Sequence, residues 1–486
     1  MTGYVEQLKG YIHLKEWRMS LAGTLLAVLV GLIIGKFGIA GVALLFLVPS
    51  SLALVIWTLL QPRVGFLIYV QLCFIINGLP RFVPFFFPFG VMADAILWLT
   101  LIGLFLNYKS LDWSRLNNPV FYLVLAWFLY TLLQIFNPQS PTPQAWLMAV
   151  RGFSVYWILV TVIGLLLFRD VHDLTLIIRL WLIWSILAAL WAFKQQYIGL
   201  TGGEVAWLNA GGAKTHLLAG RLRSFSFYSD AGQFGAEMAY TTLLCLIRVL
   251  EERGLSRKLF YFALAAILFW GFAVSGSRGP LFVILAGLPV YLVVRGNPWL
   301  LVVGVFIVTG LFGFLKYTTI GNTNYQIFRM RTAVNPTEDA SFQVRLDNQQ
   351  KVAEYMQSRP FGAGVGSSGD WAIRFTPGSF LAETPPDSWL VKVWIETGVV
   401  GLVIYGIIIF TIIIVGAFKI NRIRNKSFKM LMASMLGGFV GIFVTSYANP
   451  IVGQFPTSSI LYVTVVLLFI CDEFDRKLNP NEYIRV

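Results

Sequence analysis

Charged residues are scarce in this chain. Only 12% of its 486 residues are Asp, Glu, Lys or Arg, and 57% are hydrophobic. A soluble domain carries about 25% charged residues, so this composition excludes a soluble globular protein. Each transmembrane helix needs roughly 20 apolar residues, and apolar runs of that length recur along the whole chain. The sequence therefore predicts an integral membrane protein with many spans.

Cysteine is also rare. Cys73, Cys245 and Cys471 each lie in or at the edge of a different apolar run, and no pair has the spacing of a metal or redox site. We expect all three to be small buried packing residues, as free cysteine usually is.

The apolar runs are long and continuous, which indicates helices rather than the short alternating segments of a barrel. We predict about 12–14 spans, because Pro49 and Pro80 leave open whether neighbouring runs merge. The fourteen segments are 19–35, 38–60, 64–80, 91–107, 119–136, 146–168, 173–194, 229–249, 259–275, 279–294, 297–316, 389–418, 430–448 and 456–472.

Basic residues gather in loops that an even number of spans places on one side. By the positive-inside rule this side is the cytoplasm, which also receives both termini. The net charge of +14 then reflects topology and contact with membrane lipids, and we predict no nucleic-acid partner. The N-terminus lacks a small-residue cleavage site, so we expect an uncleaved first helix. The basic residues are Lys9, Lys15, Arg18, Arg248, Arg253, Arg257, Lys258, Lys419, Arg422, Arg424, Lys426, Lys429, Arg476 and Lys477.

Two long segments, about 195–228 and 316–388, then lie on the outer face. Loops longer than about 12–15 residues are usually functional or disordered. The second contains "FQVRLDNQQKVAEYMQSRPFG", whose apolar spacing predicts an amphipathic helix. We expect its buried side to include Val344, Val352 and Met356. We divide the chain into N-terminal membrane helices (1–316), a large outer loop (317–388) and C-terminal membrane helices (389–486), within one membrane unit.

Four polar features are predicted on that outer face. Three arginines that converge there suit a diphosphate, because guanidinium binds phosphate oxygens bidentately and stays charged. Taken singly, each arginine also has a structural explanation as a headgroup anchor, a snorkelling turn cation or a partner for Asp347 or Glu354. The features are "RLRSFSFYSDAGQFGAEM" with Arg221, Arg223 and Asp230; "VSGSRGPLF" with Ser277 and Arg278; Arg345 with "RPFGAGVGSSG"; and "ETPPDSWLVKVWIETG" with Asp387.

The last feature starts an apolar run with charged residues. Asp387 is either a functional carboxylate or the N-cap of the helix that follows Pro385 and Pro386. Glu396 lies nine residues further on, roughly 13 Å along a helix, so it needs a partner, and Lys392 is four residues away. "GAGVGSSG" is not a phosphate loop, because no strand precedes it and no Gly-Lys-Ser/Thr follows.

In this order the motifs resemble those of the O-antigen ligase and O-antigen polymerase superfamily of bacterial membrane glycosyltransferases. The similarity runs through Arg223 with "SFSFYSDAG", Ser277-Arg278-Gly279, Arg345 with "RPFGAGVG", and "DSWLVKVWIETGVVG". It covers roughly residues 220–405. The resemblance implies an all-α, GT-C-like transmembrane bundle with one large periplasmic loop in the bacterial inner membrane.

The sequence departs from the family pattern at two places. The usual Pro-Asn after the first arginine reads Ala231-Gly232, and Asp387 stands where the family usually has histidine. Of the three histidines, His13 and His172 lie on the predicted cytoplasmic side. His216 is in the outer segment and is an alternative to Asp387 as the base.

The resemblance implies transfer of a polysaccharide from undecaprenyl diphosphate to an acceptor sugar of lipid A-core. Arg223 and Arg278 are expected to stabilise the leaving diphosphate and Asp387 to accept the proton. The expected substrate-binding residues are Arg221, Arg345, Ser277, Asp230 and His216. No Asp-rich or His/Cys cluster appears on the outer face, so we predict metal-independent chemistry without a cofactor. The alternatives are an O-antigen polymerase, a protein O-oligosaccharyltransferase and, from another class, a transporter.

Overall fold

The computed structural model describes residue 36 and the ranges 39–83, 88–218, 220–332, 334 and 340–478. The structure is 78% helical. Within the described ranges the strands are β1 (Leu217–Leu218) and β2 (Arg221–Leu222), which pair as a short antiparallel hairpin. The predicted all-α polytopic membrane fold is confirmed. The first predicted span, 19–35, together with Lys9, His13, Lys15 and Arg18, lies outside the described residues.

Each of the other thirteen predicted spans coincides with a helix. The helices are α2 (Ile39–Leu60), α3 (Pro62–Ile75), α4 (Gly90–Leu106), α5 (Pro119–Leu133), α6 (Pro143–Val150) continued by α7 (Tyr156–Leu167), α8 (Val171–Phe193), α11 (Ala231–Glu251), α12 (Leu255–Val274), α13 (Leu281–Arg295), α14 (Pro298–Tyr317), α19 (Trp389–Arg422), α20 (Lys426–Thr445) and α21 (Thr457–Leu478).

Eight of the described helical segments are long and apolar enough to cross a membrane, fewer than the predicted 12–14. The shorter apolar helical segments, at 10–17 residues, are Leu45–Leu60 within the 22-residue α2, and the helices α3, α4 and α13. Helix α11 does not qualify because polar residues such as Gln233, Glu237 and Thr241 interrupt its apolar sequence. The polar residues of α11 are accommodated because this helix lies in the centre of the bundle, where other helices surround it.

Glycine allows the central helices to approach closely. A Cβ on Gly287 of α13 would lie 2.7 Å from the carbonyl oxygen of Gly437 on α20, and one on Gly441 would lie 2.4 Å from that of Val283. Small residues at such crossings let two backbones touch within a membrane bundle. The α13–α20 pair thus forms a rigid wall beside α11.

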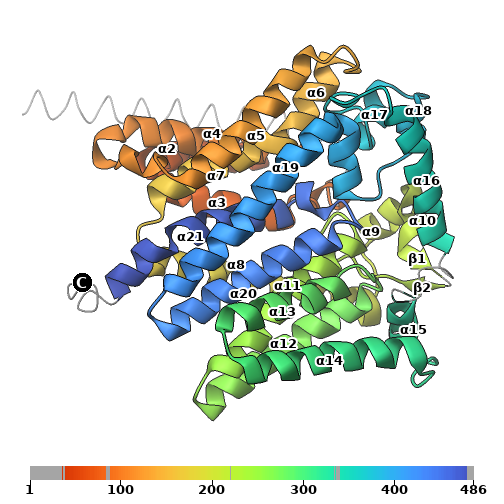
Figure 1. Ribbon diagram of the computed structural model, residues 1–486. Helices are drawn as coiled ribbons and strands as arrows, with labels where there is room; N and C mark the ends of the chain where they lie inside the picture. The colour runs from red at the N-terminus through yellow and green to blue at the C-terminus, as the bar shows by residue number, and fades with distance from the viewer. Residues whose placement is uncertain are drawn as a thin grey trace, which may run out of the picture.

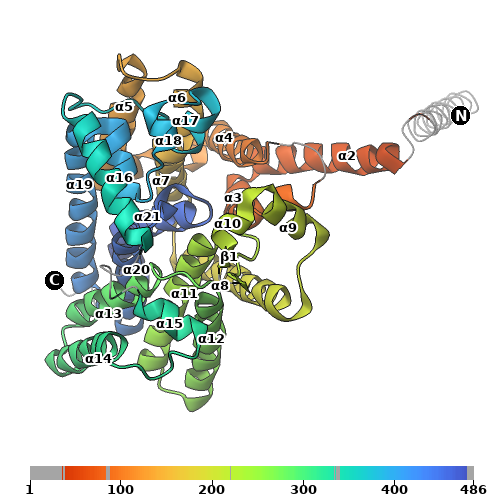
Figure 2. The ribbon, with the colours of Figure 1, turned by 90° about the vertical axis from the view of Figure 1, so that its right-hand side faces the viewer.

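The small elements gather at one end of the bundle. Figure 1 shows the elements of the two long segments at its right-hand end, which Figure 2 views face-on. We call this end the pocket face. The α11–α12 and α19–α20 turns and the end of α21 lie at the other end, the opposite face, as the predicted separation of basic turns from long segments requires. The small elements are α9 (Gly202–Trp207), α10 (Ala213–His216), β1, β2, α15 (Tyr325–Arg331), α16 (Ala340–Met356), α17 (Asp370–Phe375) and α18 (Phe380–Glu383).

The predicted amphipathic helix is α16. Val352 and Met356 are buried in a cluster with Ile395 of α19, as expected, but Val344 is 55% exposed. Our expectation for Val344 was wrong because only the C-terminal half of α16 packs in this cluster. The N-terminal half instead carries Phe342 and Arg345 to the wall of a cavity.

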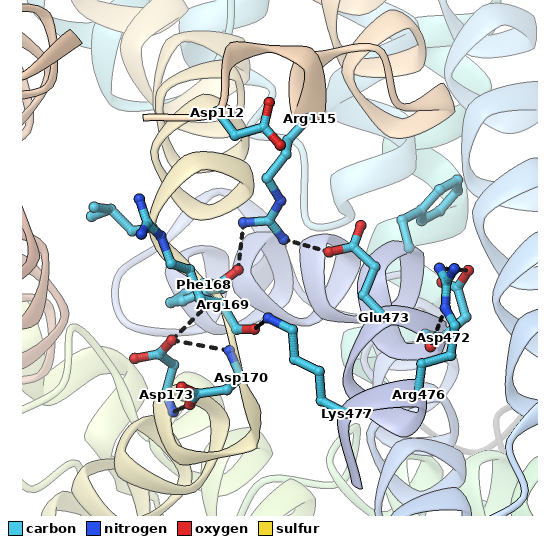
Figure 3. Close-up of polar contacts among 12 residues, drawn as sticks. Asp112, Arg115, Phe168, Arg169, Asp170, Asp173, Asp472, Glu473, Arg476 and Lys477 are labelled. Atoms are coloured by element: carbon cyan, nitrogen blue, oxygen red, sulfur yellow. Dashed lines mark hydrogen bonds and ion pairs between the residues drawn. The ribbon is translucent and has the colours of Figure 1, made fainter. Parts of the chain in front are cut away.

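A network of polar contacts connects several elements at the opposite face (Figure 3). Arg115 donates to the carboxylate of Glu473 and to the carbonyl of Phe168, both at 2.7 Å. Lys477 of α21 donates to the carbonyl of Arg169. Arg169 in turn donates its backbone N–H to Asp173, at 2.8 Å. These contacts join α21 to the start of α8 and to the 3-10 turn at Trp113–Leu116.

Candidate functional site: an arginine-lined cavity

A cavity of about 500 Å³ opens at the pocket face. Its walls come from the segment before α11, the α12–α13 turn, α15, α16 and the segment after α20. Four residues singled out from the sequence line it: Arg223, Ser277, Arg278 and Arg345. The expected convergence of three arginines is therefore present in the structure, although more than 120 residues separate the first from the last.

Arg223 is held by protein groups, which argues against a simple headgroup anchor. Its guanidinium donates to the Thr215 carbonyl at 2.7 Å, the Ser277 hydroxyl at 2.5 Å and the Ser275 carbonyl at 3.2 Å. These three neutral acceptors orient the guanidinium. Gly276, at φ +56°, permits this approach, because a Cβ there would lie 3.1 Å from Cγ of Arg223.

Arg278 lies on the same tight turn and contacts the loop above the bundle. Its guanidinium donates to the hydroxyl of Thr332 at 3.0 Å. That hydroxyl donates to the carbonyl of Arg329 at 2.8 Å, and Arg329 donates back to the Gly276 carbonyl at 3.4 Å. These contacts fasten the end of α15 to the α12–α13 turn, so the loop and the membrane helices form one wall.

Arg345 pairs with Asp387 and not with Asp347 or Glu354, the partners considered from the sequence. The Arg345 Nε and an Asp387 carboxylate oxygen lie 3.8 Å apart. The two residues share a small pocket between α16 and α19, and Arg345 lines both this pocket and the large cavity. Burial raises the pKa of Asp387, while the positive charge of Arg345 acts in the opposite direction.

The N-cap interpretation of Asp387 is wrong. Ser388 caps α19, and its hydroxyl accepts a hydrogen bond from the Val391 backbone N–H at 3.4 Å. The two prolines before Asp387 leave this residue one position ahead of the cap, so its carboxylate is directed to Arg345 instead of the helix end. Asp387 is thus available for another role.

The Gly-rich turn has a structural role around Glu396. This fully buried carboxylate accepts from the Gly366 backbone N–H at 2.9 Å and from the Ser368 hydroxyl at 2.6 Å. Lys392 completes the group with an ion pair at 2.5 Å, as predicted from the four-residue spacing. Gly362, Gly364 and Gly366 all have positive φ, which lets the turn fold closely over α19. The turn therefore anchors the large loop on the bundle.

Besides Asp387, which lines only the small pocket, three residues proposed from the sequence are not among the residues that line the cavity. Arg221 is exposed on β2. Asp230 caps α11 by accepting from the Gly232 and Gln233 backbone N–H groups, at 2.6 and 3.0 Å. We now expect Arg221 and Asp230 to shape the site without contacting the reacting groups.

His216 is the third of these proposed residues that do not line the cavity. Its Nε2 accepts from the Ala231 backbone N–H at 3.1 Å, which leaves Nδ1 to donate to the Gly212 carbonyl at 3.0 Å. Burial lowers the pKa of His216, and both ring nitrogens are engaged with backbone. These contacts do not favour His216 as the alternative base. His216 helps to secure the N-terminus of α11.

Sequence reasoning missed several lining residues. Lys214 and Arg329 add two further cations to the cavity, and Tyr447 and Asn449 form its far side. Lys214 and Arg329 both lie in the two long segments, so the concentration of basic residues there was a usable signal. The Asn449-Pro450 break between the last two spans was another, because it ends a membrane helix at the same face.

An apolar groove of about 630 Å³ adjoins the cavity. Residues of α19 and α20 line most of it, including Leu402 and Val440. Groove and cavity share Phe282, Tyr447 and Ala448 as lining residues, so the two spaces are contiguous. The combined site has a cationic end at the pocket face and an apolar end between membrane helices.

Within the described ranges, no group of three or more His, Cys, Asp or Glu side chains could hold a metal ion. All three cysteines are buried and free, as expected from their apolar surroundings. The charged side chains that line the cavity are Lys214, Arg223, Arg278, Arg329 and Arg345.

Comparison with known families matches residues 263–406 to the family described as O-antigen ligase. The match contains Ser277, Arg278, Arg345 and Asp387, whereas Arg223 lies before it. A search of curated proteins found no match. The matched domain lies within an all-α polytopic membrane fold. The motifs, the fold and the matched domain support the O-antigen ligase and O-antigen polymerase superfamily as the one that this chain resembles.

Proposed function

We propose that this protein is a glycosyltransferase that moves a polysaccharide from undecaprenyl diphosphate to an acceptor sugar of lipid A-core. The observation that carries the proposal is the contiguous site, in which an arginine-lined cavity meets an apolar groove. A lipid-linked diphosphate has the same division into an anionic and an apolar part. The family match supports a lipid-linked glycan donor and a glycan acceptor in general.

Arg223 and Arg278 bind the donor diphosphate in this proposal. As the glycosidic bond to the diphosphate breaks, negative charge grows on the leaving oxygen, and preorganised guanidinium groups stabilise it. Arg223 is suited to this role because three neutral acceptors already fix its orientation. The arginines thereby take the place that a divalent cation has in many phosphate-transferring enzymes, so we propose metal-independent transfer.

Asp387 is the proposed general base. It accepts the proton of the acceptor hydroxyl while that oxygen bonds to the anomeric carbon and undecaprenyl diphosphate departs. Its pocket adjoins the cavity through Arg345, which lines both. Burial raises the pKa of Asp387 and makes it a stronger base than an exposed aspartate. Arg345 limits that rise and positions the carboxylate.

We propose a location in the bacterial inner membrane, with both termini in the cytoplasm and the pocket face in the periplasm. The basic turns at the opposite face support this orientation. The division into membrane helices (1–316 and 389–486) and an outer loop (317–388) belongs to the same proposal. The loop supplies Arg329 and Arg345 to the cavity, so we treat it as part of one membrane unit.

The acceptor distinguishes this ligase from an O-antigen polymerase or a protein O-oligosaccharyltransferase with the same donor. Purified protein in detergent would be given a lipid-linked glycan with lipid A-core, a second lipid-linked repeat unit or a Ser/Thr-containing acceptor protein. Product is expected with lipid A-core, and label found only in longer lipid-linked chains would instead identify a polymerase. Turnover without a membrane barrier would exclude transport as the activity, and an EDTA arm tests metal independence.

A further inference from the structure

Three glutamates of the described chain are completely buried: Glu204, Glu237 and Glu396. An ionised carboxylate in a protein interior requires a charged partner and hydrogen bonds to both oxygens. Two of the three satisfy this requirement. Glu204 pairs with Lys194 at 3.1 Å, and Glu396 pairs with Lys392 at 2.5 Å.

Both of these carboxylates also receive neutral donors. Glu204 accepts from the Thr201 backbone N–H at 2.7 Å and from the Trp191 indole at 2.9 Å. Burial by itself raises the pKa of Glu204, but these hydrogen bonds outweigh it and keep the pKa below its ordinary value. Glu204 is therefore a buried and ionised reference for the third glutamate.

Glu237 is in a different environment, between α8 and α21. Its Oε1 accepts from the indole N–H of Trp181, the same kind of donor that Trp191 offers to Glu204. Its Oε2 has no hydrogen-bond partner in the structure. No lysine, arginine or histidine of the described residues forms an ion pair with Glu237, in contrast to Glu204 and Glu396.

The groups around Glu237 are hydroxyls and aromatic rings. The titratable side chains that interact with it are the phenols of Tyr228 and Tyr240, which supply no positive charge. The Thr457 hydroxyl of α21 also interacts with Glu237, and neither this hydroxyl nor Oε2 has a hydrogen bond in the structure. A proton on Oε2 removes the uncompensated charge, and we expect the protonated acid to donate to the Thr457 oxygen, which would satisfy both atoms.

We propose that Glu237 is a buried proton-binding site whose carboxylic acid stays protonated at neutral pH and bonds α11 to α21 through Thr457. Helix α11 follows the Arg223 segment, and α21 follows the Asn449 wall of the cavity. The protonated acid thus joins the helices that extend from two cavity walls. This inference does not depend on the proposed function, because it concerns a carboxyl outside the cavity.

The test compares wild type, Glu237→Gln and Glu204→Gln, all purified in detergent. Infrared difference spectra at neutral pH should show the carbonyl band of a protonated carboxylic acid in wild type that is absent from Glu237→Gln. Glutamine keeps the shape and the donor of the neutral acid, so Glu237→Gln should unfold at the wild-type temperature. Glu204→Gln should unfold several degrees lower, because the partly buried Lys194 loses its charged partner.

Three results would overturn the proposal. The first is the absence of any carboxylic acid band that the Glu237→Gln change removes. The second is stabilisation of wild type by sodium relative to choline that Glu237→Gln abolishes, which would assign a monovalent cation and not a proton to this carboxyl. A Glu237→Gln protein as unstable as Glu204→Gln would likewise show that Glu237 is ionised.

Discussion

The two ends of this bundle use arginine in opposite ways. At the opposite face, Arg115 donates to the carboxylate of Glu473 and to the carbonyl of the buried Phe168, so a carboxylate of the protein compensates its charge. At the pocket face, Arg223 is held by two carbonyls and a hydroxyl and lines a cavity. The comparison teaches that the position of an arginine, in an interhelical contact or on a cavity wall, says more about its role than the residue type does.

The largest predicted effect is at Asp387, the proposed base, whose pocket adjoins the arginine-lined cavity through Arg345. Asp387→Asn removes the proton acceptor and is expected to lower turnover by about 10²–10⁴-fold without lowering the unfolding temperature. Glycan transfer assays and thermal unfolding measure the two quantities. Ser388→Ala is the matched control, because it removes the observed helix cap and should cost about 1 kcal/mol of stability while turnover persists. Wild-type turnover in Asp387→Asn would refute the base.

Arg278→Ala tests the binding side of the comparison. Loss of one preorganised cation at the diphosphate should lower turnover by about 10²–10³-fold, with folding intact. Arg115→Ala, at the opposite face, is the counterpart and should retain turnover per folded molecule. Equal losses of turnover in both variants would show that the distinction between the faces is wrong.

Arg115→Ala should affect stability more than it affects turnover. Arg115→Ala leaves the Phe168 carbonyl and the Glu473 carboxylate without their donor, and we expect a loss of about 1–3 kcal/mol in unfolding free energy. Arg476→Ala breaks the pair between Arg476 and Asp472, which is more exposed, and should cost less than about 0.5 kcal/mol. Chemical unfolding in detergent compares the two. A larger loss for Arg476→Ala would contradict the structural role of the buried contact.

The pH dependence of turnover sharpens the link between Arg345 and Asp387. Burial raises the pKa of Asp387 and Arg345 lowers it, so Arg345→Gln should raise this pKa further. Transfer needs the ionised carboxylate, so turnover rises with pH through this pKa. The acid limb of the profile should therefore move to higher pH in Arg345→Gln, by about one unit. An unmoved limb would assign it to another group.

Much of the site chemistry was readable from local sequence. The motifs at Arg223, Ser277-Arg278 and Arg345 predicted cations at one face, and the four-residue spacing predicted the Lys392–Glu396 pair that the structure contains. Other local expectations failed where two neighbouring residues compete for one role. Ser388 and not Asp387 caps α19, since the cap depends on where the backbone leaves the extended conformation after Pro386.

The chain's apolar runs and basic loops by themselves determined a helical membrane bundle, because lipid admits few other structures and every buried backbone group must be paired. Only the tertiary structure decided which charges meet. Arg345 lay near Asp347 and Glu354 in sequence, yet it pairs with Asp387, because α16 packs across the start of α19. His216 was equally undecided until the fold brought α10 to the start of α11 and buried the His216 ring against Trp207 and Phe225. Side-chain partners depend on how helices pack, and that information is distributed over the whole chain.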